Sequence, residues 1–468
     1  MSAIAWIALG SLAAWGWLLL GQGLFWRTDQ RLPTGHARVE PETWPRVTVV
    51  VPARDEAEVL PLSLPSLLVQ DYPGEAEIVL VDDGSSDGTG KLAGDLAARY
   101  GGLPLTVTSP GEPEPGWTGK LWALRHGIAL ARARGGEPGR PGAAHHPASP
   151  DRPLGPDHPA SPDRPSRPDH PASPDRPSRP DHPASPDRPP GPDHPSPPDR
   201  PHTPSPSLSP EFLLLTDADI AHEPDSLRLL VAAAVGNELD LVSQMARLRV
   251  ASGWERLIVP AFVYFFAQLY PFRWINRRRH PRTTAAAGGC VLLRTETAER
   301  AGVPESIRQA VIDDVSLARA VRRAGGRIWL GLADRVDSVR PYPHLGDLWR
   351  MVSRSAYAQL RHNPLVLAGT VAGLAVVYLA PPVALAAGLF GGDAVAGWAG
   401  GLAWAVMAGT YLPMLRYYRQ SLLLAPTLPF TALLYLLMTV DSAVQHYRGR
   451  GAAWKGRTYA RPEAAPDR

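Results

Sequence analysis

Two carboxylates one residue apart stand directly after an apolar run, residues 213–215, and are the starting point for a chemical reading of the chain. They are Asp217 and Asp219. An unbroken leucine run is typical of a strand buried on both faces of a parallel sheet. In an extended segment, residues i and i+2 point the same way, so both carboxylates could approach one divalent cation, Mg²⁺ or Mn²⁺. The alternative is that they cap a helix beginning at Ala221.

Two other acidic segments follow predicted strands. Glu56 comes shortly after a β-branched run that ends at Pro52, and Asp82 and Asp83 follow a second apolar run. Carboxylates at such strand ends could accept hydrogen bonds from a nucleobase or a ribose hydroxyl. Alternatively, Glu56 complements a helix N-terminus and the Asp-Gly-Ser segment forms a turn.

The elements that must position these residues form a repeating pattern. A strand over 47–52, a helical pattern over 60–68 and a strand over 77–81 make a strand–helix–strand unit, which predicts an α/β fold with a mainly parallel sheet. The acidic loops should therefore meet at one rim of that sheet. The sequence argues against a kinase or a dehydrogenase, because Lys120 is not part of a phosphate loop and no G-x-G-x-x-G motif follows a strand.

Three of these segments together resemble the family-2 inverting glycosyltransferases: 52–56, 81–89 and 216–219. The resemblance runs from about residue 45 to 360, apart from one insertion. It implies a GT-A fold, a nucleotide-sugar donor and a divalent cation. It assigns Asp219, with Asp217, to the metal, and it assigns donor binding to these residues: Pro52, Glu56, Asp82, Asp83 and Asp217.

Two further segments extend the resemblance. Lys120 lies in a stretch similar to the family's Gly-Lys segment, where a cation would balance the donor pyrophosphate; the alternative is a lysine on a solvated helix face. Gly288 and Gly289 precede an apolar strand, as expected where backbone approaches a ligand closely. They resemble the family segment beside the donor sugar.

An acidic pair, Asp313 and Asp314, precedes an amphipathic helical pattern. The family motif is Glu-Asp followed by two residues and Leu. Asp313 replaces the Glu, and Asp314 aligns with the aspartate that serves as general base. The alternative is a helix cap. No Gln-x-x-Arg-Trp motif follows near 350–357, which favours a single transfer over chain growth.

Composition limits the function classes. The 468 residues carry a net charge of +3, and no basic stripe is interleaved with aromatics, which argues against nucleic acid as a partner. The single cysteine, Cys290, excludes an intramolecular disulfide framework and fits a reducing compartment.

The N-terminal segment, residues 3–26, has no charge and exceeds the roughly 20 apolar residues that cross a bilayer. It ends in bulky residues, unlike a cleaved signal peptide. Arg27 and Arg31 follow it, so the positive-inside rule places the N-terminus outside and the next domain on the cytoplasmic side. The expected membrane is the cell's inner (plasma) membrane.

Further apolar segments follow the α/β region. Residues 254–272 predict an interfacial helix or a lipid-facing groove rather than a span, or else a buried helix. Three C-terminal segments cover 365–390, 394–415 and 422–440. Three crossings would put the basic tail outside, against the positive-inside rule. The last segment should therefore be re-entrant, or one segment does not span.

Between the two halves of the α/β region lies a Pro-rich insertion. A 12-residue unit that starts with His-Pro-Ala-Ser-Pro-Asp begins at His146 and restarts at positions 158, 170, 182 and 194. It lacks apolar side chains, which predicts a disordered or polyproline II loop. Chelation of a metal by the histidines is an alternative.

Because this composition cannot form a core, deleting residues 146–201 should leave membrane insertion and turnover within a few-fold of the full chain. Activity of the shortened protein in isolated membranes checks this. A shortened protein that fails to fold, or that has no activity, would mean that the repeat is structural or catalytic.

The predicted organisation is an anchor (1–26), two halves of the α/β domain (27–134 and 211–362) around the insertion (135–210), membrane segments (363–441) and a basic tail (442–468). This arrangement, with the ending 441–459, resembles the hopene-associated branch of the family, which implies a lipid acceptor linked to hopanoid synthesis. A polyprenyl-phosphate sugar transferase and a non-catalytic scaffold binding through the repeat remain alternatives. The oligomeric state stays open.

Overall fold

A computed structural model describes residues 1–33, 40–134, 209–277, 283–448, 453–454 and 457–458. The Pro-rich repeat and most of the basic tail lie outside the described residues.

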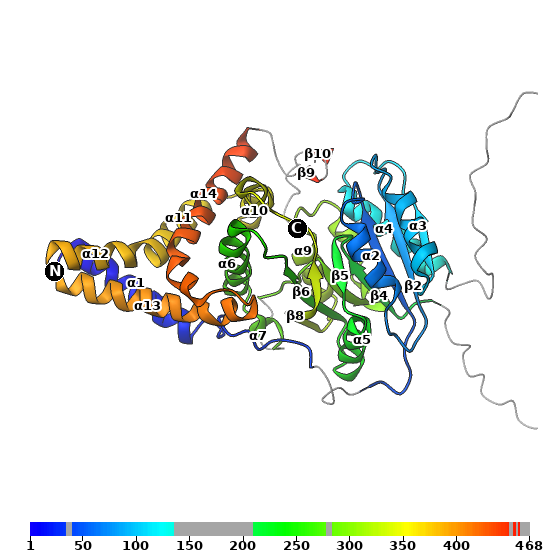
Figure 1. Ribbon diagram of the computed structural model, residues 1–468, viewed down its shortest axis with the longest axis horizontal. Coiled ribbons are helices and arrows are strands. Elements are labelled where there is room, and N and C mark those ends of the chain that lie inside the picture. Colours follow the sequence, from blue (N-terminus) through cyan, green and yellow to red (C-terminus); the bar gives the residue numbers. More distant parts are fainter. Residues whose placement is uncertain (34–39, 135–208, 278–282, 449–452, 455–456, 459–468) are drawn as a thin grey trace, which may run out of the picture. The chain divides into compact units, whose positions relative to one another are not determined.

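An eight-stranded mixed sheet forms the centre of the α/β domain (Figure 1). Its strand order is β3-β2-β1-β4-β7-β6-β8-β5. The pairs β1–β2, β2–β3, β1–β4 and β6–β8 are parallel, whereas β7 is antiparallel to both neighbours and β5 to β8. The predicted α/β fold with a mainly parallel sheet is confirmed. The strands are β1 (Val47–Ala53), β2 (Ala76–Asp82), β3 (Leu105–Thr108), β4 (Phe212–Thr216), β5 (Ile220–His222), β6 (Leu241–Leu248), β7 (Cys290–Arg294) and β8 (Ile328–Ser338), and a separate pair is β9 (Ala453–Trp454) with β10 (Arg457–Thr458).

Helices cover the sheet and form the apolar part of the chain. They are α1 (Ala3–Leu20), α2 (Leu60–Leu68), α3 (Thr89–Tyr100), α4 (Gly119–Arg134), α5 (Ser226–Gly236), α6 (Gly253–Leu269), α7 (Phe272–Ile275), α8 (Thr295–Arg300), α9 (Asp313–Arg323), α10 (Leu345–Gln359), α11 (Pro364–Leu374), α12 (Ala380–Gly391), α13 (Ala394–Tyr417) and α14 (Leu428–Tyr447). A short π-helix, η3 (Ala375–Leu379), joins α11 to α12, and a 3₁₀ segment, η4 (Leu422–Thr427), precedes α14.

The central strands are buried on both faces, which explains their unbroken apolar sequence. Every residue of β1 and β4 is buried. Val50 and Leu215 join the apolar cluster that contains Leu124 of α4, whereas Val49 and Leu214 join the cluster that contains α2. Because neighbouring positions face opposite layers and both layers are apolar, alternation disappears from the sequence.

The residues after β4 decide between the two predictions for the Asp-Ala-Asp segment. A short strand, β5, follows Asp219, and helix α5 begins only at Ser226. Helix capping by these carboxylates is therefore wrong. The expected extended geometry is also wrong, because the Ile220 amide donates to the Asp217 carbonyl at 3.1 Å and closes a turn.

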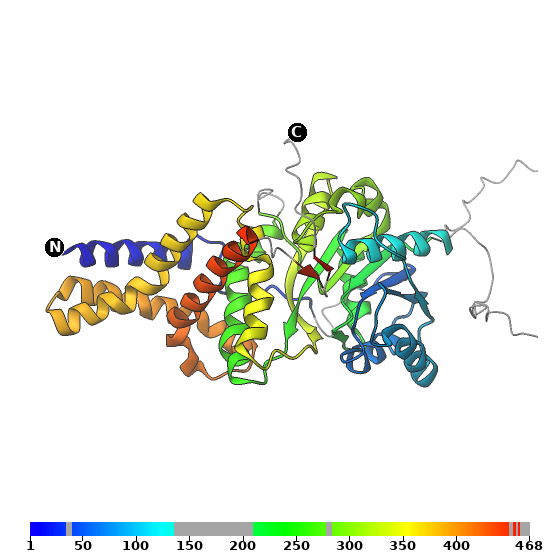
Figure 2. The same ribbon diagram turned by 90° about the horizontal axis from the view of Figure 1, so that it is seen from above.

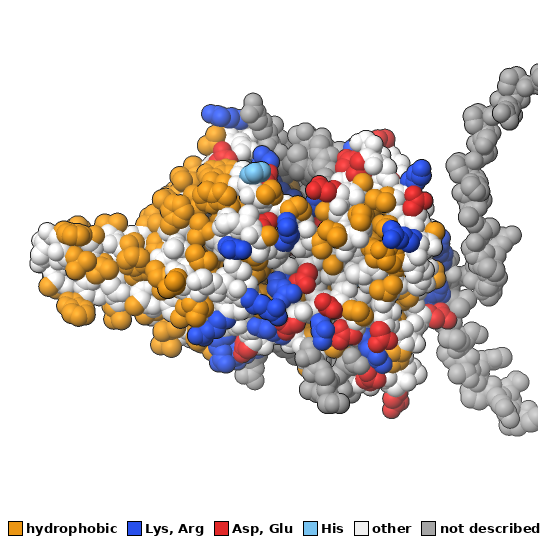
Figure 3. Space-filling view, viewed as in Figure 1, with side chains coloured by type: hydrophobic (Ala, Val, Ile, Leu, Met, Phe, Trp, Pro, Cys, Tyr) orange, Lys and Arg blue, Asp and Glu red, His pale blue; other side chains and the backbone are white. Residues whose placement is uncertain are grey.

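Three helical stretches among the described residues are long and apolar enough to cross a membrane: Ala3–Leu20, Pro364–Gly391 and Leu422–Tyr447. Of these, α1 and α12 pack together with α13 (Figure 1). Side chains at the start of α1 and of α13 meet, since the Ser2 hydroxyl donates to the Asp393 carboxylate. Figure 3 shows that hydrophobic side chains cover this bundle.

Helix α14 packs differently, against the amphipathic helices α10 and α6. The Trp349 indole donates to Asp441 at 2.8 Å, and the Tyr357 amide donates to the Ser442 hydroxyl at 3.0 Å. In Figures 1 and 2, α14 runs across the direction of the α1–α12–α13 bundle. Helix α6 also contacts α13, and two of its large apolar side chains, Trp254 and Leu269, are exposed.

Candidate active site

A lysine bridges two of the predicted carboxylates at the rim of the sheet. Lys120, in the first turn of α4, places its Nζ 2.8 Å from Asp217 Oδ1 and 3.0 Å from Asp313 Oδ2. Asp217 follows β4, and Asp313 begins α9. Elements separated by nearly 200 residues are therefore joined by one ammonium group. Lys120 is not a lysine on a solvated helix face.

Asp314 lies beside this bridge and is held by backbone amides. The Gly288 amide donates to Oδ2 at 3.0 Å, and the Val315 amide donates to Oδ1 at 2.7 Å. A Cβ on Gly288 would lie 3.3 Å from Asp314 Cβ and 3.6 Å from Lys120 Nζ. Glycine thus lets the backbone approach both side chains closely.

The environment shifts the pKa values of this group of residues. Burial, followed by the charge of Asp313, raises the pKa of Asp314 to about 7, against a lowering by Lys120. Burial also raises the pKa of Asp217, although Lys120 opposes the shift. Burial disfavours the charged form of Lys120, but the carboxylates of Asp217 and Asp313 outweigh it and raise its pKa. Asp314 is thus a carboxylate whose affinity for a proton suits neutral pH.

Asp219 faces a different cation, which the sequence reading missed. Arg340, two residues beyond β8, places its Nε 2.9 Å from Asp219 Oδ2 and its Nη2 2.5 Å from Glu56 Oε2. The Ser338 hydroxyl also donates to Asp219, at 3.3 Å. An arginine directly after a strand end was the available signal, but nothing in the sequence showed that β8 ends at the acidic rim.

The remaining residues predicted to bind the nucleotide-sugar donor lie at the neighbouring strand ends. Asp82 Oδ1 accepts from the Ser85 amide at 2.9 Å, and Asp83 is buried with Arg54 Nη1 3.5 Å from its Oδ2. The Gly289 carbonyl accepts from the Thr216 hydroxyl at 2.9 Å. The chain bends at Gly84, and the Asp82 side chain holds this bend through the Ser85 amide.

A small hollow of about 20 Å³, space for about one water molecule, is lined by just over half of the predicted site residues. These residues are among those that line it: Pro52, Lys120, Asp217, Gly288, Asp313 and Asp314. Apolar side chains from α4, β4 and α9 complete its wall. Glu56, Asp82, Asp83 and Asp219 lie along the adjoining rim rather than in this hollow.

Asp217 and Asp219 fit part of a coordination sphere for a divalent cation. Mg²⁺ and Mn²⁺ are commonly held by one or two carboxylates together with water and phosphate oxygens. The charge of Asp219 contributes to the raised pKa of Asp217, so the two carboxylates lie within electrostatic reach of each other. Within the described residues no group of three or more His, Cys, Asp or Glu side chains is arranged to hold a metal. The donor set therefore suits an ion completed by a ligand's phosphates.

Family models match both halves of the α/β domain. The model for Glycosyl transferase family 2 matches residues 48–134, and that for Glycosyl transferase family 21 matches residues 209–463, more than half of the chain. The chain belongs to glycosyl transferase family 21. The predicted family-2 resemblance is confirmed for the stretch with the Pro52 and Asp82 segments.

Two curated glycosyltransferases match part of the chain. A probable glycosyltransferase, YdaM, of Bacillus subtilis is 35% identical over 18% of this chain and 20% of its own length. The glycosyltransferase AglE of Haloferax volcanii is 35% identical over 14% of this chain and 22% of its own. The chain thus spans about a fifth of the length of these curated relatives.

A solved structure has the same fold over almost the whole chain. It is the mannosyltransferase PcManGT from Pyrobaculum calidifontis in complex with GDP-Man and Mn²⁺. The TM-score is 0.51 at 18% identity, and the match covers 95% of this family 21 chain and 99% of PcManGT. The predicted GT-A fold is confirmed.

Replacing Lys120 by Met should destabilise the protein more at pH 8 than at pH 5. Without the ammonium, nothing at this position opposes the raising of the pKa of Asp217 by burial, so the folded state binds its proton more readily than the unfolded chain and stability falls as pH rises. Breaking a buried pair costs about 3–5 kcal/mol, and because these side chains are 19–34% exposed we expect roughly half of that.

Thermal unfolding in detergent at both pH values measures this difference. Lys91→Met, at an exposed position on α3, is the matched control and should be neutral at either pH. Equal behaviour of the two variants would show that the Lys120 bridge contributes nothing.

Proposed function

We propose that this glycosyltransferase moves one sugar from a nucleotide-sugar donor to the hydroxyl of a membrane lipid, with inversion at the anomeric carbon. The observation that carries the proposal is the placement of Asp314 beside the Lys120 bridge, on the backbone of Gly288. A proton acceptor and a cation for a phosphate thus lie close together at the rim of the sheet, beside Gly288.

The proposed reaction is a single displacement. The acceptor oxygen attacks C1 of the sugar, the bond from C1 to the phosphate oxygen breaks, and the acceptor proton passes to Asp314. Asp314 suits this step because its pKa is raised to about 7. Asp313 is the poorer candidate, since its Oδ2 already faces Lys120 at 3.0 Å.

The leaving diphosphate needs positive charge. Lys120 and Arg340 supply two cations at the rim, each now shared between two carboxylates. A divalent ion held by Asp219 and Asp217 would add Lewis-acid stabilisation of the departing phosphate oxygens. Glu56, Asp82, Asp83 and Pro52 would position the nucleoside. PcManGT, with GDP-Man and Mn²⁺ on the same fold, supports this part of the proposal.

A lipid acceptor is supported by the helices that meet the site. Burial raises the pKa of Tyr270, at the end of α6, and the charge of Asp314 adds to this shift, so the two side chains lie within electrostatic reach of each other. Gln359 of α10 donates to the Tyr270 hydroxyl. The Tyr342 amide, two residues beyond Arg340, donates to Glu255 of α6 at 2.7 Å. The proposed base thus lies near the amphipathic helices α6 and α10, where a lipid hydroxyl could arrive. A hopanoid-type lipid is the acceptor that the branch resemblance adds.

The same helices suggest how the topology conflict resolves. We infer that α1, α11–α12 and α13 cross the membrane, with Ser2 and Asp393 on the outer side. Although Leu422–Tyr447 is also long and apolar enough to span, α13 has 24 residues and packs against α1 and α12. Helix α14 then lies along the inner surface with α6 and α10, as its crosswise direction in Figures 1 and 2 supports. Arg416, Arg448 and the catalytic domain are all cytoplasmic in this arrangement, which satisfies the positive-inside rule.

Labelling of single cysteines in a Cys290→Ala background tests this topology. A membrane-impermeant maleimide added to intact cells should label Asp393→Cys and should leave Arg448→Cys unlabelled until the membrane is opened. Labelling of Arg448→Cys in intact cells would mean that α14 spans.

Product analysis tests the proposed activity. The full chain in proteoliposomes is incubated with labelled nucleotide sugars and membrane lipids. Label in a lipid whose sugar is attached to an alcohol supports the proposal. Label only on polyprenyl phosphate would identify the rival transferase, and absence of label with every donor would favour a scaffold.

A further inference from the structure

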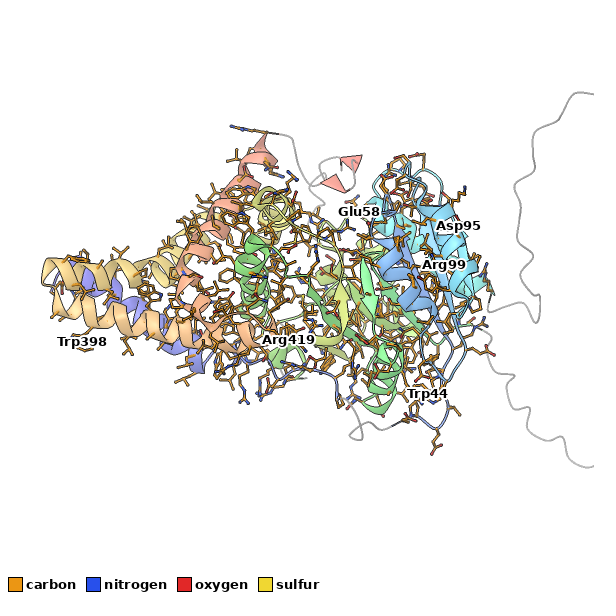
Figure 4. All side chains as sticks on the ribbon, in the orientation of Figure 1. Trp44, Glu58, Asp95, Arg99, Trp398 and Arg419 are labelled. Carbon is orange, nitrogen blue, oxygen red and sulfur yellow. The ribbon has the colours of Figure 1, made fainter. Side chains whose placement is uncertain are left out.

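An arginine-lined cavity lies at the end of α13 that faces the catalytic domain, away from the proposed active site. Its volume is about 400 Å³. It is lined by four arginines, one aspartate and three other residues: Arg31, Arg247, Arg416, Arg419, Asp334, Thr28, Pro413 and Tyr417. Figure 4 places Arg419 near one end of α13 and Trp398 near the other.

Two of the arginines are fixed by carboxylates. Arg31 Nη1 lies 2.9 Å from Asp334 Oδ1, and its guanidinium stacks over the Tyr417 ring at 4.9 Å from the ring centre. Arg247 donates through Nε and Nη2 to Asp337, at 2.7 and 3.0 Å. These contacts hold the two side chains in the cavity wall.

The other two arginines carry charge that is not neutralised locally. Arg416 and Arg419 are exposed, and in the described part of the chain neither has a carboxylate within ion-pair distance. The Arg419 amide donates to the Arg416 carbonyl at 3.0 Å, in the turn that ends α13. Two neighbouring cations thus share one concave surface with two others.

Exposed apolar side chains adjoin these charges. Leu423, four residues after Arg419, is 87% exposed, and Leu20 at the end of α1 is 76% exposed. Figure 3 shows Lys and Arg side chains gathered where the hydrophobic surface of the helices ends. A ligand that satisfies both features has an anionic head and an apolar tail.

We propose that this cavity binds the phosphate headgroup of an anionic phospholipid from the leaflet next to the catalytic domain. Arginine donates in pairs to phosphate oxygens, which suits the convergence of Arg416, Arg419, Arg31 and Arg247. The acyl chains would lie against α1 and η4. This site differs from the donor and acceptor sites and does not depend on the proposed transfer reaction.

The headgroup site also lies next to the end of β8, which contacts Asp219. A neighbouring hollow shares Arg247 and Arg419 and is lined by Ser338 and Val339 at the end of β8. The Val339 amide donates to the Asp219 carbonyl at 2.9 Å. Bound lipid would therefore stabilise the end of β8, and protein stability can report its binding.

The test is a thermal-unfolding titration of the full chain in neutral detergent. The probes are dioctanoyl phosphatidylglycerol, dioctanoyl phosphatidylcholine and glycerol phosphate. We expect a saturable rise in Tm with phosphatidylglycerol alone. An equal rise with phosphatidylcholine would overturn a site for anionic headgroups, and an equal rise with glycerol phosphate would overturn a lipid as the ligand.

The double variant Arg416→Gln/Arg419→Gln should bind phosphatidylglycerol about 30-fold more weakly, since each basic residue near a membrane surface contributes about 1 kcal/mol. Arg416→Lys/Arg419→Lys keeps the charge but loses the paired N–H donors, so its affinity should lie between those of the Gln double variant and wild type. The control Lys91→Gln/Arg99→Gln removes the same charge from α3, which Figure 4 shows distant from α13, and should bind normally.

Unchanged affinity in the Gln double variant, or equal weakening in the α3 control, would overturn the site. If the double variant does not fold, the two single Gln variants decide, each with an expected loss of about fivefold. Wild-type affinity in both would overturn the site.

Discussion

Asp314→Asn should remove most of the turnover and little of the donor affinity. An amide cannot accept the acceptor proton, and general-base catalysis typically contributes about 10² to 10⁴ in rate. The base acts in the transition state and scarcely touches the bound nucleotide, so the loss should fall on kcat. Turnover of labelled donor, measured beside calorimetric affinity for the nucleoside diphosphate, gives both quantities.

Asp313→Asn is the matched control, one residue away in the same helical turn. It removes one carboxylate from the Lys120 bridge but not the proposed base, so turnover should fall less than in Asp314→Asn. Near-normal turnover in Asp314→Asn with an inactive Asp313→Asn would make Asp313 the base.

The pH dependence adds a second signature to this prediction. With a pKa of about 7, Asp314 is protonated at lower pH and then cannot accept a proton. The kcat/KM for the acceptor should therefore fall about tenfold per pH unit below that value. A flat profile between pH 5 and 8 would contradict a base with this pKa.

The second large effect is expected from Asp219→Ala. This change should abolish metal-dependent binding of the nucleoside diphosphate while the fold stays intact. Asp219 lies at the rim, where Arg340 also contacts Glu56, so Arg340 keeps one partner after the substitution. Calorimetric titration of the diphosphate with and without Mn²⁺ or Mg²⁺ measures the effect.

Asp95→Ala, on the exposed face of α3 (Figure 4), is the control for Asp219→Ala and should bind as wild type does. An unchanged affinity in Mn²⁺ and in Mg²⁺ for Asp219→Ala would remove Asp219 from the metal site.

Much of the fold could be predicted because the apolar runs are unambiguous. The run before Asp217 reads as a doubly buried strand because β4 has apolar layers on both faces. The position of β7 could not be predicted in the same way. Its insertion antiparallel between β4 and β6 depends on pairing with segments about 80 and about 50 residues away along the chain, and no local pattern encodes that.

In the candidate site, too, the residues in local motifs could be predicted, whereas those that depend on distant strand pairing could not. Asp217, Lys120, Asp313 and Asp314 were identified from motifs, and the structure brings them around one hollow. Arg340 was missed because its role depends on where β8 ends relative to β4. The turn after Asp217 was missed because the 217–219 segment was taken as extended, whereas the chain there bends to start β5.

The anomeric configuration of the product tests the proposed chemistry most directly. The wild-type chain is given a nucleotide sugar of known configuration, and the glycolipid is examined by NMR spectroscopy. A single displacement assisted by Asp314 predicts a product with the opposite anomeric configuration. A product that retains the donor configuration would contradict it, because retention requires a different route from donor to acceptor.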